Sequence, residues 1–135
     1  WNMASQTAVE AERYRIEWDE DVSAVLYTWT EFASGAEFRE GANALLDYVV
    51  DRGAERVIVD TSGIEAHDDA DQKWLQEEWT PDLIDEGATT VAMVRNESVI
   101  SKMDMEAFME EMEDLPYDAL VTDDLEEARE WVAEN

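Results

Sequence analysis

The stretch RVIVDTSGI, residues 56–64, decides the fold class, because it leads from an apolar strand directly into a polar loop. Its first half is a β-branched run, which is typical of a parallel strand buried on both faces. Asp60 ends that run, and the residues up to Gly63 favour a turn. We therefore expect a parallel sheet, with a polar loop at the carboxyl end of this strand.

The segments on both sides of this strand alternate between strand and helix patterns. Two alternating runs separated by an acidic turn predict a β-hairpin before it, and apolar residues recur at helical spacing after it. The order ββαβαβαβα predicts one α/β domain over residues 13–135, with a mixed sheet of about five strands covered by about four helices. In this sheet the N-terminal hairpin is followed by parallel βα units. We expect strands at 14–18, 22–29, 56–60, 89–94 and 117–121, and helices at 38–50, 68–87, 98–113 and 123–133.

Several residues predict where these helices begin, end or bend. Gly53 is a C-cap for the first helix, and Asp123 or Asp124 is an N-cap for the last. Pro81 follows Thr80 inside the second helix, which predicts either a kink or a restart with Thr80 as N-cap.

Residues 1–12 show neither an apolar period nor a turn pattern. We expect them to form a flexible tail. Trp1 and Asn2 precede Met3, which indicates a tag remnant ahead of the native start.

The charge of the chain indicates its surroundings and excludes some partners. It carries 9 Lys+Arg against 36 Asp+Glu, a net charge of −27, and only Lys73 and Lys102 are lysines. The acid is spread along the whole chain, whereas an acidic patch dedicated to a basic partner would be clustered. Such a surface repels itself in dilute buffer and is screened at molar salt, which predicts a protein of a halophile's cytoplasm. Nucleic acid and anionic membranes would be repelled, so we expect neither as a partner.

The loop that follows the central strand gathers the chain's polar candidates for an interaction site. It contains the single histidine and several carboxylates, at the sheet edge where sites of open α/β folds gather. We expect no cofactor, no metal and no catalytic residue, and a surface that meets a protein partner. The interaction residues predicted there are Asp60, Thr61, Ser62, His67, Asp68 and Asp69.

Three other interpretations of this loop remain open. Ser62 and His67 would be the reactive pair of a hydrolase, although the sequence has no nucleophile elbow. His67 and the neighbouring aspartates would offer metal ligands, although the EF-hand spacing is absent and there is one histidine only. The plainest interpretation is that the aspartates cap the next helix and favour its positive end; these are Asp68, Asp69 and Asp71.

A methionine-rich helix provides a second candidate site. Met105, Phe108, Met109 and Met112 recur at helical spacing, which predicts an apolar face. This face is either ordinary core or the wall of an adaptable pocket, since thioethers adjust to varied ligands. The pocket would hold a small apolar molecule between this helix and the one that carries two tryptophans. The residues predicted to line it are Trp74, Trp79, Met103, Met105, Phe108, Met109 and Met112.

The chain resembles the STAS domains, and in particular the SpoIIAA-like (STAS/SEC14-type) members, as a halophilic representative. The similarity extends from Tyr14 to about Val132 and rests on the order of elements and on three segments: VIVDTSGI at 57–64, the region 74–87 with EWTP at 78–81, and VAMV at 91–94. It implies a non-enzymatic regulatory or protein-interaction domain. In the anti-sigma factor antagonists a serine is phosphorylated at the position that matches Asp69, where this chain carries a fixed negative charge.

The sequence thus favours a non-catalytic regulatory or interaction module with a protein partner. The alternative is a carrier for a small apolar ligand. An exposed Trp or Met would also permit a homodimer.

The charge leads to a prediction about stability. Transfer from molar KCl to about 50 mM salt should lower the melting temperature, because the Debye length grows from about 3 Å to more than 10 Å and the carboxylates repel one another. Calorimetry at a series of KCl concentrations measures this shift. A melting temperature that does not change with salt would contradict the halophile interpretation.

Overall fold

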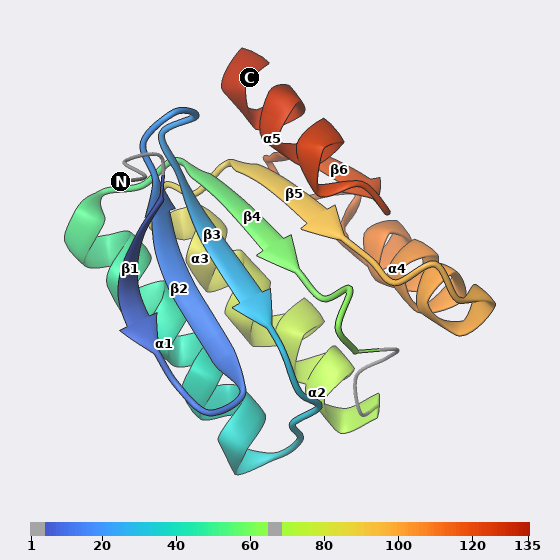
Figure 1. Ribbon diagram of the computed structural model, residues 1–135. Helices are drawn as coiled ribbons and strands as arrows, with labels where there is room; N and C mark the ends of the chain where they lie inside the picture. Colours follow the sequence, from blue (N-terminus) through green and yellow to red (C-terminus); the bar gives the residue numbers. More distant parts are fainter. Residues whose placement is uncertain (1–4, 65–68) are drawn as a thin grey trace.

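The computed structural model describes residues 5–64 and 69–135, which form one mixed sheet with helices on both faces (Figure 1). The strands lie side by side in chain order; β1 to β3 are antiparallel, and β3 to β6 are parallel. The expected α/β class, the hairpin and the parallel units are confirmed. The strands are β1 (Ser5–Glu10), β2 (Tyr14–Asp19), β3 (Ala24–Trp29), β4 (Arg56–Asp60), β5 (Thr90–Val94) and β6 (Asp118–Thr122).

The expectation of a flexible tail is wrong for residues 5–10, which form the edge strand β1. Its backbone pairs with β2 from Ser5 opposite Asp19 to Glu10 opposite Arg15, with an irregularity between Thr7 and Val9. A neighbouring strand supplies the hydrogen bonds that fix this segment, so no apolar period of its own is needed. The predicted tag remnant lies outside the described residues.

The helices divide unequally between the two faces of the sheet. Buried side chains of α1, of the run from α2 to α3 and of α4 pack in one core against one face. The opposite face of β4 to β6 is covered by α5, whose Ala128 and Val132 are fully buried (Figure 1). The helices are α1 (Ala36–Arg52), α2 (Asp69–Trp74), the π-helical turn η1 (Leu75–Trp79), α3 (Thr80–Asp85), α4 (Val99–Met112) and α5 (Leu125–Glu134).

Two predicted caps are confirmed. Gly53 adopts the left-handed conformation (φ 69°) after α1 and donates its N–H to the carbonyls of Val49 and Val50. The carboxylate of Asp124 caps α5 and accepts from the N–H groups of Glu126 and Glu127.

The stretch from α2 to α3 is one continuous helical run with a π-helical turn just before Pro81. The Thr80 N–H donates to the carbonyl of Leu75, five residues back, and Thr80 keeps right-handed helical angles. A restart with Thr80 as N-cap is therefore wrong. The irregularity expected from Pro81 takes the form of the wider π turn, which accommodates the missing N–H of proline. None of the helices in the described ranges is long and apolar enough to cross a membrane.

An aromatic cluster joins α1 to the sheet. The ring centroids of Trp29 and Phe38 lie 5.4 Å apart in a stacked arrangement, and Tyr14 and Tyr27 lie within 6 Å of Trp29. Gly41 faces this cluster: a Cβ atom there would lie 2.7 Å from Cη2 of Trp29 and 3.1 Å from Cε1 of Tyr14. The absence of a side chain at Gly41 therefore lets the helix approach the sheet closely.

Gly41→Ala should destabilise the protein, although alanine is the better helix former by about 1 kcal/mol. The added methyl group displaces buried rings, and such overpacking costs about 1–3 kcal/mol. Urea unfolding measures the difference. Asn43→Ala, at an exposed site of the same helix, is the control and should be neutral or slightly stabilising. Equal stabilisation by both variants would show that the close approach is not a constraint.

Candidate functional site

The predicted interaction loop uses much of its polar chemistry within the chain. Oδ1 of Asp60 accepts from the backbone N–H of Ser62 at 2.9 Å and from its hydroxyl at 2.6 Å. The Thr61 hydroxyl is buried and donates to the Val94 carbonyl at 3.1 Å. Ser62 and Asp69 are exposed. His67 and Asp68 lie outside the described residues, so the loop is described only in part.

The predicted helix-capping role of Asp71 is wrong. Its carboxylate is buried and accepts from the backbone N–H of Gly35, with Oδ2 at 2.9 Å and Oδ1 at 3.2 Å from that nitrogen. Nε of Arg39 lies 3.8 Å from Oδ1. Asp71 thus ties the start of α1 to α2. It also lies with Asp69 in the first turn of α2, so the expectation that these two aspartates favour the positive end of that helix is confirmed.

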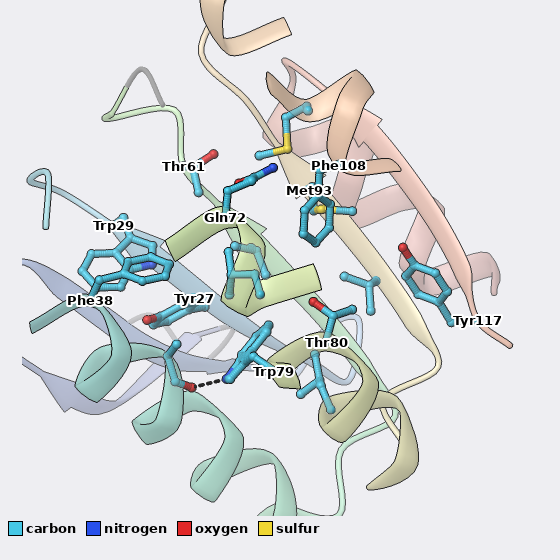
Figure 2. Close-up of a pocket in the computed structure, with 16 residues that line it drawn as sticks. Tyr27, Trp29, Phe38, Thr61, Gln72, Trp79, Thr80, Met93, Phe108 and Tyr117 are labelled. Carbon is cyan, nitrogen blue, oxygen red and sulfur yellow. Dashed lines mark hydrogen bonds between the residues drawn. The ribbon is translucent and has the colours of Figure 1, made fainter. Parts of the chain in front are cut away.

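An apolar pocket lies between the sheet, α1, the run from α2 to α3, and α4 (Figure 2). The cavity has a volume of about 60 Å³. A cavity needs about 10–15 Å³ to hold one water molecule. A ligand of several non-hydrogen atoms therefore fits without movement of the lining side chains. Sixteen of the described residues line it: Tyr27, Trp29, Phe38, Ala42, Val59, Thr61, Gln72, Leu75, Trp79, Thr80, Leu83, Val91, Met93, Met105, Phe108 and Tyr117.

The structure places the residues predicted to line a pocket in different environments. Trp79, Met105 and Phe108 line the cavity. Trp74 and Met109 are half-buried beside the core, and Met112 is buried within it; none of the three lines the cavity. The inclusion of Met103 is wrong: it is 64% exposed, because it lies outside the face that carries Met105 and Phe108.

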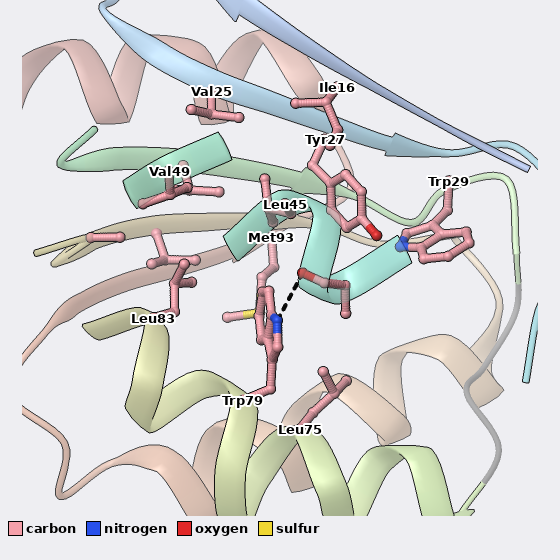
Figure 3. Packing of buried hydrophobic residues seen from close by; sticks show 14 of the residues in the cluster. Ile16, Val25, Tyr27, Trp29, Leu45, Val49, Leu75, Trp79, Leu83 and Met93 are labelled. Atoms are coloured by element: carbon pink, nitrogen blue, oxygen red, sulfur yellow. Dashed lines mark hydrogen bonds between the residues drawn. The ribbon is translucent and has the colours of Figure 1, made fainter. Parts of the chain in front are cut away.

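The π-helical turn positions three of the lining side chains. Leu75 and Trp79 lie at its two ends, and Thr80 follows directly. The indole Nε1 of Trp79 donates to the carbonyl of Ala42 in α1 at 2.9 Å (Figure 3). This bond satisfies the polar atom of the tryptophan and leaves its ring as an apolar wall. π turns within α-helices often occur at functional sites.

Four polar atoms of the lining have no hydrogen-bond partner of standard geometry among the described residues. They are Oη of Tyr27, Oε1 of Gln72, Oγ1 of Thr80 and Oη of Tyr117. Burial raises the pKa of Tyr27 far above its ordinary value; the neighbouring Tyr14 adds to this rise, and the Trp29 indole N–H partly offsets it. Burial also raises the pKa of Tyr117. The pocket is therefore apolar but contains neutral groups that are able to donate and accept hydrogen bonds.

Sequence reasoning missed the part of the pocket that the strands contribute. Tyr27 and Trp29 lie on the same face of β3, and Met93 faces the cavity from β5. On β3 the alternation of Tyr27 and Trp29 with the less buried Leu26 and Thr28 was a sufficient signal for the face, whereas β5 is buried on both faces and gave no such signal. Neither pattern indicated a cavity. No group of acidic or histidine side chains in the described ranges could hold a metal ion. Comparison with protein-family models and with curated protein sequences finds no match to this chain.

The raised pKa of Tyr27 predicts a loss of stability at alkaline pH. The unfolded tyrosine ionises at its ordinary pKa of 10.0, whereas the buried one stays protonated. The folded state therefore binds more protons, and its stability falls as the pH rises above about 10. Urea unfolding at pH 9 and pH 11 should show a smaller fall for Tyr27→Phe than for the native chain. Identical falls would mean that Tyr27 ionises without unfolding.

Proposed function

We propose that this chain is a non-catalytic binding protein that holds a small, mainly apolar molecule in the pocket. The observation that carries the proposal is the cavity of about 60 Å³, lined mainly by apolar side chains of the core. Protein cores contain few voids larger than a water molecule. Leaving a cavity of this size empty would cost stability on the order of 1 kcal/mol, so a molecule that fills it would be stabilising.

The chemistry of the lining favours binding over catalysis. The described residues of the lining include no Asp, Glu, Lys, Arg or His. Acid–base and nucleophilic catalysis at neutral pH need a group that can exchange a proton or be activated by a base. The hydroxyls of Tyr27 and Tyr117 are kept protonated by their raised pKa values. These groups suit recognition of a molecule rather than its conversion.

The pocket also has adaptable walls. Met93 approaches from β5 (Figure 2). Met105 lines the cavity from α4, so flexible thioethers border it from two elements. Methionine fills irregular spaces and changes rotamer at low cost. This arrangement supports a pocket that closes around ligands of somewhat different shape.

Docking of a protein partner at the loop of residues 60–71 stays a prediction. The hydrogen bonds of Asp60 and Thr61 stay within the chain, which leaves Ser62 and Asp69 as the exposed predicted residues among those described there. The resemblance to STAS domains and the halophilic cytoplasm are likewise predictions. The pocket is the feature that most directly supports a function.

Filling the cavity should abolish binding. Ala42 is buried and lines the pocket, so Ala42→Leu places three additional carbon atoms at its wall. Methyl NMR of the methionines follows a titration with cyclopentanol or methylcyclopentane. In the native chain the Met93 and Met105 signals should shift while exposed Met103 does not, and in Ala42→Leu the affinity should fall by at least about tenfold.

Asn43→Leu is the matched control, because it adds the same side chain at the next, exposed position of α1 and should bind like the native chain. Urea unfolding establishes that Ala42→Leu is folded. If neither probe shifts the Met93 and Met105 signals of the native chain, the pocket is a packing defect and the proposed function is wrong.

A further inference from the structure

The polar atoms around the pocket describe the ligand more closely than its apolar walls do. They come from β3, from two positions of the helical run α2 to α3, and from the segment before β6. Tyr27 is 2% exposed and Thr80 is 5% exposed. Oγ1 of Thr80 has no partner of standard geometry among the described residues, and Oη of Tyr27 has only the Trp29 indole N–H beside it, outside standard geometry. Gln72 and Tyr117 are half-buried and contribute one further such oxygen each (Figure 2).

Leaving such groups unpaired is costly. A buried donor or acceptor without a partner loses its hydrogen bonds to water and gains nothing in exchange. Thr and Tyr hydroxyls both donate and accept, whereas the Gln72 Oε1 atom only accepts. A ligand hydroxyl is the simple group that can pair with any of them, because it also both donates and accepts.

The lining also specifies the charge of the ligand. Within residues 5–64 and 69–135 it contains no Lys, Arg or His to pair with a carboxylate, and no Asp or Glu to pair with an ammonium group. Burying a charge without a partner costs far more than burying a hydroxyl that is hydrogen-bonded. The pocket therefore disfavours fatty acids and amines.

We propose that the molecule held in the pocket is uncharged, mainly apolar and carries a hydroxyl group that hydrogen-bonds to Thr80 or Tyr27. This inference rests on the proposed binding function and names its ligand class. The cavity of about 60 Å³ limits the ligand to a small alcohol unless Met93 and Met105 move aside.

Three matched probes test the ligand class: cyclopentanol, methylcyclopentane and cyclopentanecarboxylate. The first two have nearly the same shape and differ only in the hydroxyl group, and the third carries a charge. Methyl NMR of Met93 and Met105 gives the affinities at constant salt. We expect methylcyclopentane to bind about tenfold more weakly than cyclopentanol, and the carboxylate at least about a hundredfold more weakly.

Two variants locate the hydrogen bond. Thr80→Val and Tyr27→Phe each remove one hydroxyl with little change of shape, and at least one of them should abolish the preference for cyclopentanol over methylcyclopentane. Thr28→Val is the control, since Thr28 neighbours Tyr27 on β3 and faces the opposite side of the sheet. It should keep the full preference. Having two variants keeps the test valid if one does not fold.

The outcomes separate this inference from the proposed function. If methylcyclopentane binds as tightly as cyclopentanol, or if both variants keep the preference, the pocket binds ligands but the inferred hydroxyl group is wrong. If the carboxylate binds as tightly as cyclopentanol, the inference that the ligand is uncharged is wrong. If no probe shifts the Met93 and Met105 signals, the binding function is wrong and the inference fails with it.

Discussion

The hydrogen bond from the Trp79 indole to the Ala42 carbonyl, 2.9 Å long and buried, joins the two helices on which the pocket depends. The adjacent residue, Gly41, admits the Trp29 ring against the backbone of the same helix. Gly41 thus sets the distance of α1 to the sheet, and its neighbour Ala42 sets the distance of α1 to η1. Because both contacts leave little freedom of adjustment, the space that remains toward α4 becomes a defined cavity rather than a variable gap.

The π-helical turn determines which side chains of this helical run face the cavity. A regular α-helix through Pro81 would lack one hydrogen bond and would rotate the following residues differently. The wider turn from Leu75 to Trp79 places both of its end residues and Thr80 at the cavity. An element that is irregular for a local reason thereby provides one wall of the pocket.

Local patterns predicted much of the fold but not the parts that depend on distant neighbours. The β-branched run before Asp60, the hairpin and the cap at Gly53 each follow from a few adjacent residues and are confirmed. The edge strand β1 was missed because its order comes from pairing with β2. Asp71 was misplaced for a similar reason, since its partner Gly35 is 36 residues away.

In the candidate site, too, local patterns predicted some residues but not those that depend on distant neighbours. Helical spacing correctly singled out Met105 and Phe108, yet proximity in sequence wrongly added Met103. Tyr27 and Thr80 carry the most informative polar atoms of the pocket. In the sequence they are an ordinary strand residue and a residue before proline. Only the packing of helices on one sheet face shows that these two hydroxyls lack partners of standard geometry among the described residues, because a pattern within one element contains no information about what lies opposite.

The acidic surface and the neutral pocket act on ligands under different conditions. In dilute buffer a net charge of −27 repels anions before they reach the protein, so the surface alone would disfavour a carboxylate. At molar salt the Debye length is about 3 Å and this repulsion is largely screened. The cost of burying an unpaired charge beside Tyr27 and Thr80 is not removed by screening in the bulk solvent. If the proposed pocket selects against charged ligands at high salt, that selection must come from its lining, whose described residues include no ionised group.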